Sequence, residues 1–162
     1  MFNKVVTRVR LDNLGPVDYL EWSNVGSINL IIGRNGTGKT LLLKAIYASL
    51  KSLERFKRGA EPDALEAVLS DQLRRTFQGD KLGDLVRKGE KDGLRVAVDL
   101  GEERLSFQIA AKSDALKSVS LVADRNVYQE DSIFIPAKEI LTLGRLIRET
   151  RERDYPIWYG FG

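Results

Sequence analysis

Two residue types that often carry chemistry at neutral pH are missing from this 162-residue chain: it has no cysteine and no histidine. Without cysteine there is neither a disulfide framework nor a thiolate nucleophile. Without histidine the chain lacks the side chain that most often serves as a general base and as a metal ligand. Any catalysis must therefore use carboxylates, lysine, arginine, hydroxyl groups or a bound cofactor.

Long apolar runs are also missing from the sequence. No stretch approaches the length of a membrane span, and residues 1–4 show no apolar signal-peptide core. We therefore expect a cytoplasmic protein without membrane contact. The 26 basic and 23 acidic residues are interspersed and give a net charge of +3, a balance that permits contact with DNA but does not indicate it.

Composition and periodicity predict one globular α/β domain. Hydrophobic residues make up 43% of the chain and charged residues 30%, which is typical of a folded domain. The predicted strands span residues 5–11, 17–22, 27–32, 94–100, 104–110, 119–123 and 133–135, and the predicted helices span 39 to about 56, 82 to 87 and 137 to about 153, with a further helix opened by Pro62. We expect a mixed sheet around the helix that begins at Lys39, with an antiparallel β part and a helical excursion over about 58–92. Residues 1–162 are interpreted as a single nucleotide-binding lobe.

The most informative motif is the glycine-rich loop, residues 33–40, which fits the P-loop pattern GxxxxGK[ST]. Glycines at three of its positions let the backbone curl with its N–H groups pointing at phosphate. We expect Lys39 to reach the β- and γ-phosphates and the Thr40 hydroxyl to ligate Mg²⁺. An apolar strand before the loop and a buried helix after it supply the required context. The predicted nucleotide-binding residues are Gly33, Arg34, Asn35, Gly36, Thr37, Gly38, Lys39, Thr40 and Leu41.

The ligand predicted for this loop is a nucleoside triphosphate, ATP together with Mg²⁺. No Asn/Thr-Lys-x-Asp guanine motif is present, which favours adenine as the base. Two aspartates that close apolar strands, Asp99 and Asp124, look like the magnesium-holding aspartate of such ATPases. Neither is followed by the glutamate that would activate water, because Leu100 and Arg125 stand there. We interpret both as ordinary strand ends.

Three basic stretches invite a nucleic-acid interpretation: residues 51–58, 74–75 and 145–153. Each is interleaved with acidic residues or lies at helical spacing opposite an apolar stripe. We therefore interpret them as solvated helix faces.

Further features go beyond the loop itself. A strand-turn-strand prelude of about thirty residues precedes it, the stretch 28–46 reads INLIIGRNGTGKTLLLKAI, and residues 132–143 read SIFIPAKEILTL. With these features the chain resembles the front half of an ABC-type ATPase head of the RecF/SMC/OLD group. In that group two heads sandwich ATP between the P-loop of one and the signature motif of the other. The resemblance implies a parent ATPase that works as a homodimer.

The same resemblance shows what is missing. The chain has no LSxGQ-like signature, no Asp-Glu strand and no switch histidine. The resemblance therefore covers the nucleotide-gripping lobe, and hydrolysis is expected to require a C-terminal lobe that these residues do not include. The aromatic cluster at residues 155–161 agrees with a chain that is the front part of a longer protein.

Three functions remain open from the sequence. The first is the ATP-binding module of an ATPase, whose role in DNA maintenance or defence rests on fold-level analogy. The second is a nucleotide-binding regulatory or assembly module that never hydrolyses ATP. The third is a basic nucleic-acid-binding domain with an incidental P-loop.

Two further site predictions follow from the resemblance. Arg8, Arg10 and the turn 13–16 are expected near the base and ribose; Tyr19 or Trp22 could stack on the base, although packing within the sheet is the favoured role for either. Residues 136–139 are expected to sense the γ-phosphate, with Glu139 as a candidate catalytic residue beside Lys39. ABC-type heads carry a glutamine loop there, and this chain has no glutamine at that place. The alternative for Glu139 is a helix start in which it interacts with the helix dipole.

Overall fold

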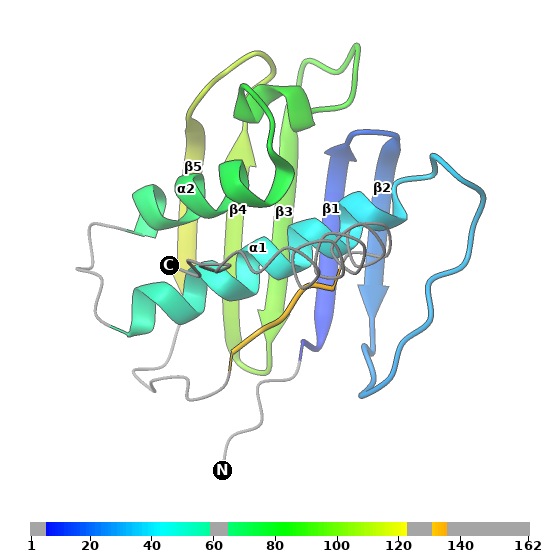
Figure 1. Ribbon diagram of the computed structural model, residues 1–162, viewed down its shortest axis with the longest axis vertical. Coiled ribbons are helices and arrows are strands. Elements are labelled where there is room, and N and C mark those ends of the chain that lie inside the picture. The colour runs from blue at the N-terminus through cyan, green and yellow to red at the C-terminus, as the bar shows by residue number, and fades with distance from the viewer. Residues whose placement is uncertain (1–5, 59–64, 123–130, 136–162) are drawn as a thin grey trace, which may run out of the picture. The chain divides into compact units, whose positions relative to one another are not determined.

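The structure, a computed structural model, describes residues 6–58, 65–122 and 131–135. The chain divides into two compact units, residues 1–132 and 133–162, and every helix and strand named below belongs to the first. Within this unit five strands form one sheet in the order β2-β1-β3-β4-β5 (Figure 1). All four pairings between neighbouring strands are antiparallel.

The strands are short and of equal length. They are β1 (Arg8–Leu14), β2 (Val17–Ser23), β3 (Leu94–Leu100), β4 (Glu103–Ile109) and β5 (Leu116–Val122). Strand β1 pairs with β2, its neighbour in sequence, and with β3, which comes about eighty residues later. The glycine-rich loop and both α-helices therefore lie in the connection between β2 and β3.

Two α-helices cover one face of the sheet (Figure 1). Helix α1 (Lys39–Lys57) contacts β1 and β3, while α2 (Leu65–Phe77) contacts β5 and packs against α1. A 3-10 helix, η2 (Leu82–Leu85), follows. Small buried residues of α1 allow close packing, and the buried hydroxyls of Ser49 and Ser52 donate to the carbonyls of Ala45 and Ala48 at 2.8 and 2.7 Å. The helix thereby satisfies these polar groups itself.

Alternation along the strands separates a core face from an open face. The helix-covered face carries the core side chains Val9, Leu11, Leu94, Val96, Val98, Leu105, Phe107 and Ile109. Arg8 and Arg10 are exposed on the opposite face, as the pattern of residues 5–11 predicted.

The mixed sheet expected from the sequence is not found in the part of the chain that the structure describes. Residues 27–32, predicted as a strand, pair with no described strand, and Ile28, Leu30 and Ile32 are 93%, 82% and 83% exposed. Instead, the Asn29 side chain closes a turn with the backbone of Gly26, at 3.0 and 2.7 Å. A strand interior to a parallel sheet needs neighbours on both sides, and these residues have neither.

Of the other predicted elements within the described residues, all but the strand at 133–135 are found with modest shifts. Strand β5 begins three residues earlier than predicted, the piece predicted at 82–87 is a 3-10 helix of four residues, and residues 133–135 form no strand. The predicted helix over 137 to about 153 lies outside the described residues. No helix among the described residues is long and apolar enough to cross a membrane.

The last residues of the first unit are fastened to α1. Glu54, 1% exposed, accepts hydrogen bonds from the backbone N–H and the hydroxyl of Ser132 at 2.8 and 2.6 Å. The neighbouring Asp131 accepts from Lys51 at 2.8 Å and from Arg58 at 3.0 Å. Because these three α1 residues are spaced at i, i+3 and i+7, one face of the helix holds the segment.

This fastening gives a testable titration. The hydrogen bonds from Lys51 and Arg58 lower the pKa of Asp131 to about 2, from an ordinary value of 3.8. The stabilisation is therefore complete above pH 3.8 and is lost as the pH falls through about 2. In an NMR titration we expect the Asp131 carboxyl to titrate near pH 2 in the wild type and closer to 3.8 in Lys51→Ala. An unshifted Asp131 in the wild type would contradict the arrangement.

Candidate functional site

The glycine-rich loop leads directly into α1. Gly36 and Gly38 have φ angles of 81° and 94°, the left-handed region that side chains disfavour. A Cβ at Gly36 would meet no atom within 4 Å, whereas one at Gly38 would collide with neighbouring side chains. Gly36 is therefore required for the backbone conformation alone, whereas Gly38 is required both for the conformation and because a side chain would not fit there.

The Lys39 side chain folds back over the loop. Its Nζ donates hydrogen bonds to the carbonyls of Gly33 at 2.8 Å and Arg34 at 2.6 Å. The Thr37 hydroxyl also donates to the Arg34 carbonyl, at 2.9 Å. The ammonium group is thus held against the loop backbone, by bonds to neutral carbonyls that a phosphate could replace with charge-assisted ones.

The start of α1 offers free donors to an anion. Gly38 is the N-cap, without a side-chain cap, and no acidic residue occupies the first turn. The N–H groups and the positive end of the helix dipole therefore face no carboxylate of their own. Thr40 is exposed at this end. Among the described residues no group of three or more His, Cys, Asp or Glu side chains could hold a metal ion by itself.

The turn between β1 and β2 packs against the end of the loop. A Cβ at Gly38 would lie 2.5 Å from Val17 Cγ2 and 3.2 Å from Pro16 Cγ, and a Cβ at Gly15 would lie 2.6 Å from Leu41 Cδ1. The predicted turn 13–16 is thus brought to the predicted loop. The position of this turn beside the base and ribose stays a prediction.

The arginines expected near the base lie on the open face of the sheet. Arg8 forms an ion pair with Glu21, and Arg10 pairs with Asp12 at 3.4 Å and lies over the Tyr19 ring. Tyr19 is 54% exposed on this face, whereas Trp22 packs against the core. Because α1 covers the other face, the structure does not bring these arginines together with Lys39.

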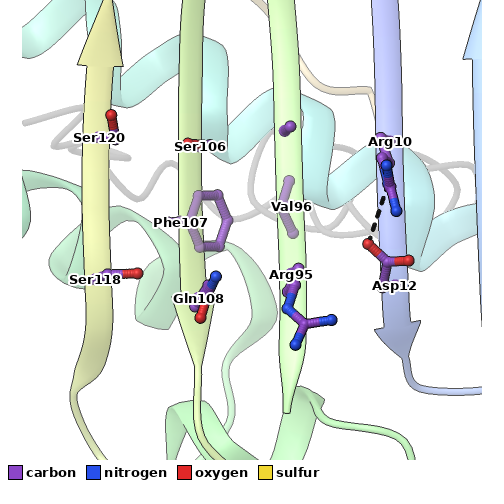
Figure 2. Close-up of a pocket in the computed structure, with 10 residues that line it drawn as sticks. Arg10, Asp12, Arg95, Val96, Ser106, Phe107, Gln108, Ser118 and Ser120 are labelled. Atoms are coloured by element: carbon purple, nitrogen blue, oxygen red, sulfur yellow. Dashed lines mark hydrogen bonds and ion pairs between the residues drawn. The ribbon is translucent and has the colours of Figure 1, made fainter. Parts of the chain in front are cut away.

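The open face of the sheet carries a pocket of about 330 Å³. Figure 2 shows the residues that line it. Arg10, Arg95, Ser106, Gln108, Ser118 and Ser120 line it. Sequence reasoning missed this pocket, because it forms only where four strands lie side by side. Among the residues that line this pocket, only Arg10 also belongs to the predicted site.

The two strand-end aspartates have different outcomes. Asp99 accepts two hydrogen bonds from Arg104, at 2.6 and 2.7 Å, and these lower its pKa. An aspartate engaged in this way by a cross-strand arginine has the structural role that we expected of it. Asp124 and Glu139 lie outside the described residues, and so does the predicted sensor segment 136–139.

The described basic stretches form ion pairs along the helices. Arg55 and Arg75 both pair with Asp71, at 2.7 and 2.9 Å, and Arg74 pairs with Asp114 at 2.8 Å. These pairs support the interpretation as solvated helix faces. The stretch 145–153 lies outside the described residues.

A glycine-rich loop that ends in Lys-Thr at the start of a buried helix is typical of P-loop nucleoside triphosphatases. Comparison with known proteins points the same way. The chain is 28% identical, over 163 aligned positions, to the DNA double-strand break repair Rad50 ATPase of Methanopyrus kandleri, covering 92% of this chain. It is 32% identical over 74 positions, 42% of the chain, to the protein of the same name from Nanoarchaeum equitans. The similarity supports, at a coarse level, the ABC-type ATPase relationship.

The aligned parts span 18% and 9% of the length of these two relatives. No family model matches the chain. No solved structure matches it either. The relationship therefore rests on sequence similarity and on the loop.

Proposed function

We propose that this chain is the MgATP-binding module of an ABC-type ATPase, with residues 33–41 as its phosphate site. The observation that carries the proposal is the geometry at the start of α1. Two of the loop's glycines, Gly36 and Gly38, adopt left-handed conformations, the Lys39 ammonium bonds to the loop carbonyls, and the first helical turn carries no acid. This combination attracts a polyphosphate and offers it both a cation and backbone donors.

In this proposal ATP replaces contacts that the loop makes with itself. Lys39 Nζ exchanges its hydrogen bonds to the carbonyls of Gly33 and Arg34 for hydrogen bonds to the β- and γ-phosphates. Thr40 would supply a hydroxyl ligand to Mg²⁺, and the bound ion would neutralise part of the phosphate charge. The chain's own residues bind and orient the triphosphate.

The exposed segment 27–32 supports a further lobe in the parent protein. Its apolar side chains Ile28, Leu30 and Ile32 are exposed, while Ile31 packs against the core. We propose that a C-terminal lobe of the parent supplies strands on either side of this segment. Most of the length of the two relatives lies outside the aligned part, which agrees with this proposal.

We further propose that the parent works as a homodimer in DNA maintenance or defence. The two relatives are by name ATPases of DNA double-strand break repair. No surface of this chain is assigned to DNA by the proposal.

We expect the chain alone to bind MgATP without turning it over. Hydrolysis needs an oriented water and a second charge clamp besides the loop and magnesium. No described side chain near the loop is placed to provide either. Isothermal titration calorimetry should give binding, and a phosphate-release assay on the same monomeric sample should stay at the level of a buffer blank.

The Lys39→Ala variant is the control for both the binding and the phosphate-release measurement. Multiple turnovers that this variant abolishes would show that the chain carries its own catalytic groups and would return Asp124 to consideration. A parent protein that binds ATP and likewise never hydrolyses it would favour the regulatory or assembly module instead. Absence of MgATP binding in the wild type would refute the proposal.

A further inference from the structure

The left-handed glycine at the end of the loop is enclosed by the first residues of β2. The Val17 side chain is half-buried, and its Cγ2 stands 2.5 Å from the place that a Cβ at Gly38 would take. Pro16 approaches the same place from one side, at 3.2 Å. Gly38 is the N-cap of α1, and its carbonyl accepts the first helical hydrogen bond, from Leu42 at 2.9 Å. Val17 therefore touches the loop where the chain changes from irregular to helical.

The turn that carries Val17 is itself held from behind. The Gly15 N–H donates to the Leu85 carbonyl at 2.8 Å, and the Arg87 N–H donates to the Asn13 carbonyl at 2.9 Å. The Asn13 side chain donates to the Gly93 carbonyl at 3.0 Å, and Arg87 forms an ion pair with Asp18 at 2.7 Å. The turn is thus fixed between the glycine-rich loop and residues 85–93, and it cannot yield without breaking these bonds.

From this arrangement we propose that Val17 is a positioning residue of the nucleotide site. Its Cγ2 methyl group holds Gly38 in the left-handed conformation and so aims the last loop N–H groups and the start of α1 at the phosphates. The inference deepens the proposed function and rests on it. Val17 does not touch the ligand; it acts through the backbone of Gly38.

The mechanism is one of preorganisation. A glycine samples left- and right-handed conformations almost equally, so the bare loop would lose much of its ordering when phosphate binds. A rigid neighbour with its own backbone in a strand removes this freedom before the ligand arrives. Removal of the two methyl groups should therefore weaken MgATP binding more than it weakens the fold.

The test compares Val17→Ala with Val119→Ala. Val119 is a half-buried strand valine on β5, far from the loop in the sheet order, and serves as the matched control. We expect calorimetry to show about tenfold weaker MgATP binding for Val17→Ala and binding within about twofold of wild type for Val119→Ala. Melting temperatures of the two variants should fall by similar amounts. Val17→Thr, which keeps the shape, should bind like the wild type.

A double-mutant comparison checks the contact itself. Gly38→Ala should cost less affinity in the Val17→Ala background than in the wild type, because the collision with Cγ2 is gone while the φ strain remains. Equal affinity of Val17→Ala and Val119→Ala would overturn the inference. If the wild type fails to bind MgATP, the proposed function fails. The positioning role is then decided by the Gly38 ³J couplings, which report φ: unchanged couplings in Val17→Ala would overturn it.

Discussion

Replacing Lys39 by alanine is expected to weaken MgATP binding by roughly ten- to a hundredfold, while the fold survives. Loss of one charge-assisted contact to phosphate corresponds to about 1.5–3 kcal/mol. The ammonium group lies over the loop on bonds to two carbonyls, and no core side chain depends on it. Titration calorimetry of the variant and the wild type measures the difference directly.

Lys44→Ala is the control for this experiment. Lys44 lies on the same helix but faces the Phe77 ring, 6.0 Å from its centroid. The control removes the same charge from α1 and should leave the affinity almost unchanged, since it makes no contact with the loop. Equal losses in the two variants would mean that net charge, and not the loop lysine, governs binding; undiminished affinity in Lys39→Ala would remove the P-loop assignment.

Gly93→Ala is expected to destabilise the protein by about 3 kcal/mol or more, from strain and overpacking together. Gly93 has a φ angle of 78°, and a Cβ there would collide with the carbonyl oxygen of Ile109. That oxygen belongs to a paired strand and cannot move aside cheaply. Urea denaturation followed by circular dichroism measures the free energy of unfolding.

Gly89→Ala separates the two causes. Gly89 has a φ angle of 92°, but a Cβ there would meet nothing within 4 Å. This control carries the backbone strain alone, about 1–2 kcal/mol. The additional loss of unfolding free energy in Gly93→Ala then reports the collision with Ile109. Equal losses in the two variants would show that the backbone at Ile109 moves aside at little cost.

The local structure could be predicted from the sequence where the residue pattern allows only one conformation. The glycine-rich loop and the helix that follows it were predicted within a residue or two, because glycine, lysine and apolar periodicity there allow few alternatives. The faces of β1 were predicted from strict alternation: Val9 and Leu11 are buried, and Arg8 is exposed.

Pairing partners were beyond the reach of local patterns. Residues 27–32 have the apolar composition of a buried strand, but a strand exists only when a neighbour accepts its hydrogen bonds. Among the described residues no such neighbour is available, and Ile28, Leu30 and Ile32 of the segment are exposed. The mixed sheet was therefore wrong for the described residues: neither 27–32 nor 133–135 forms a strand, while an antiparallel part is present.

Contacts between residues far apart in the chain could not be predicted from local patterns either. Val17 reads as the first apolar residue of an ordinary strand, and nothing local shows that Gly38 will lie against it. The one available signal was the turn before it, Gly15-Pro16, which fixes where β2 begins. Which surface that turn would meet depended on the sheet as a whole.

The position of β3 in the sheet also has a consequence for how the chain folds during synthesis. Strand β1 leaves the ribosome early, but its central neighbour β3 follows much later: Thr7 bonds to Asp99, 92 residues further along. The β3–β4–β5 hairpins need only local closure, whereas the β1–β3 pairing must close the long connection that contains the glycine-rich loop. The β1–β2 hairpin and α1 therefore lack their contacts with β3 until residue 100 has left the ribosome. The glycine-rich loop is translated early, and residues 85–93, which hold the β1–β2 turn from behind, follow only after α1 and α2.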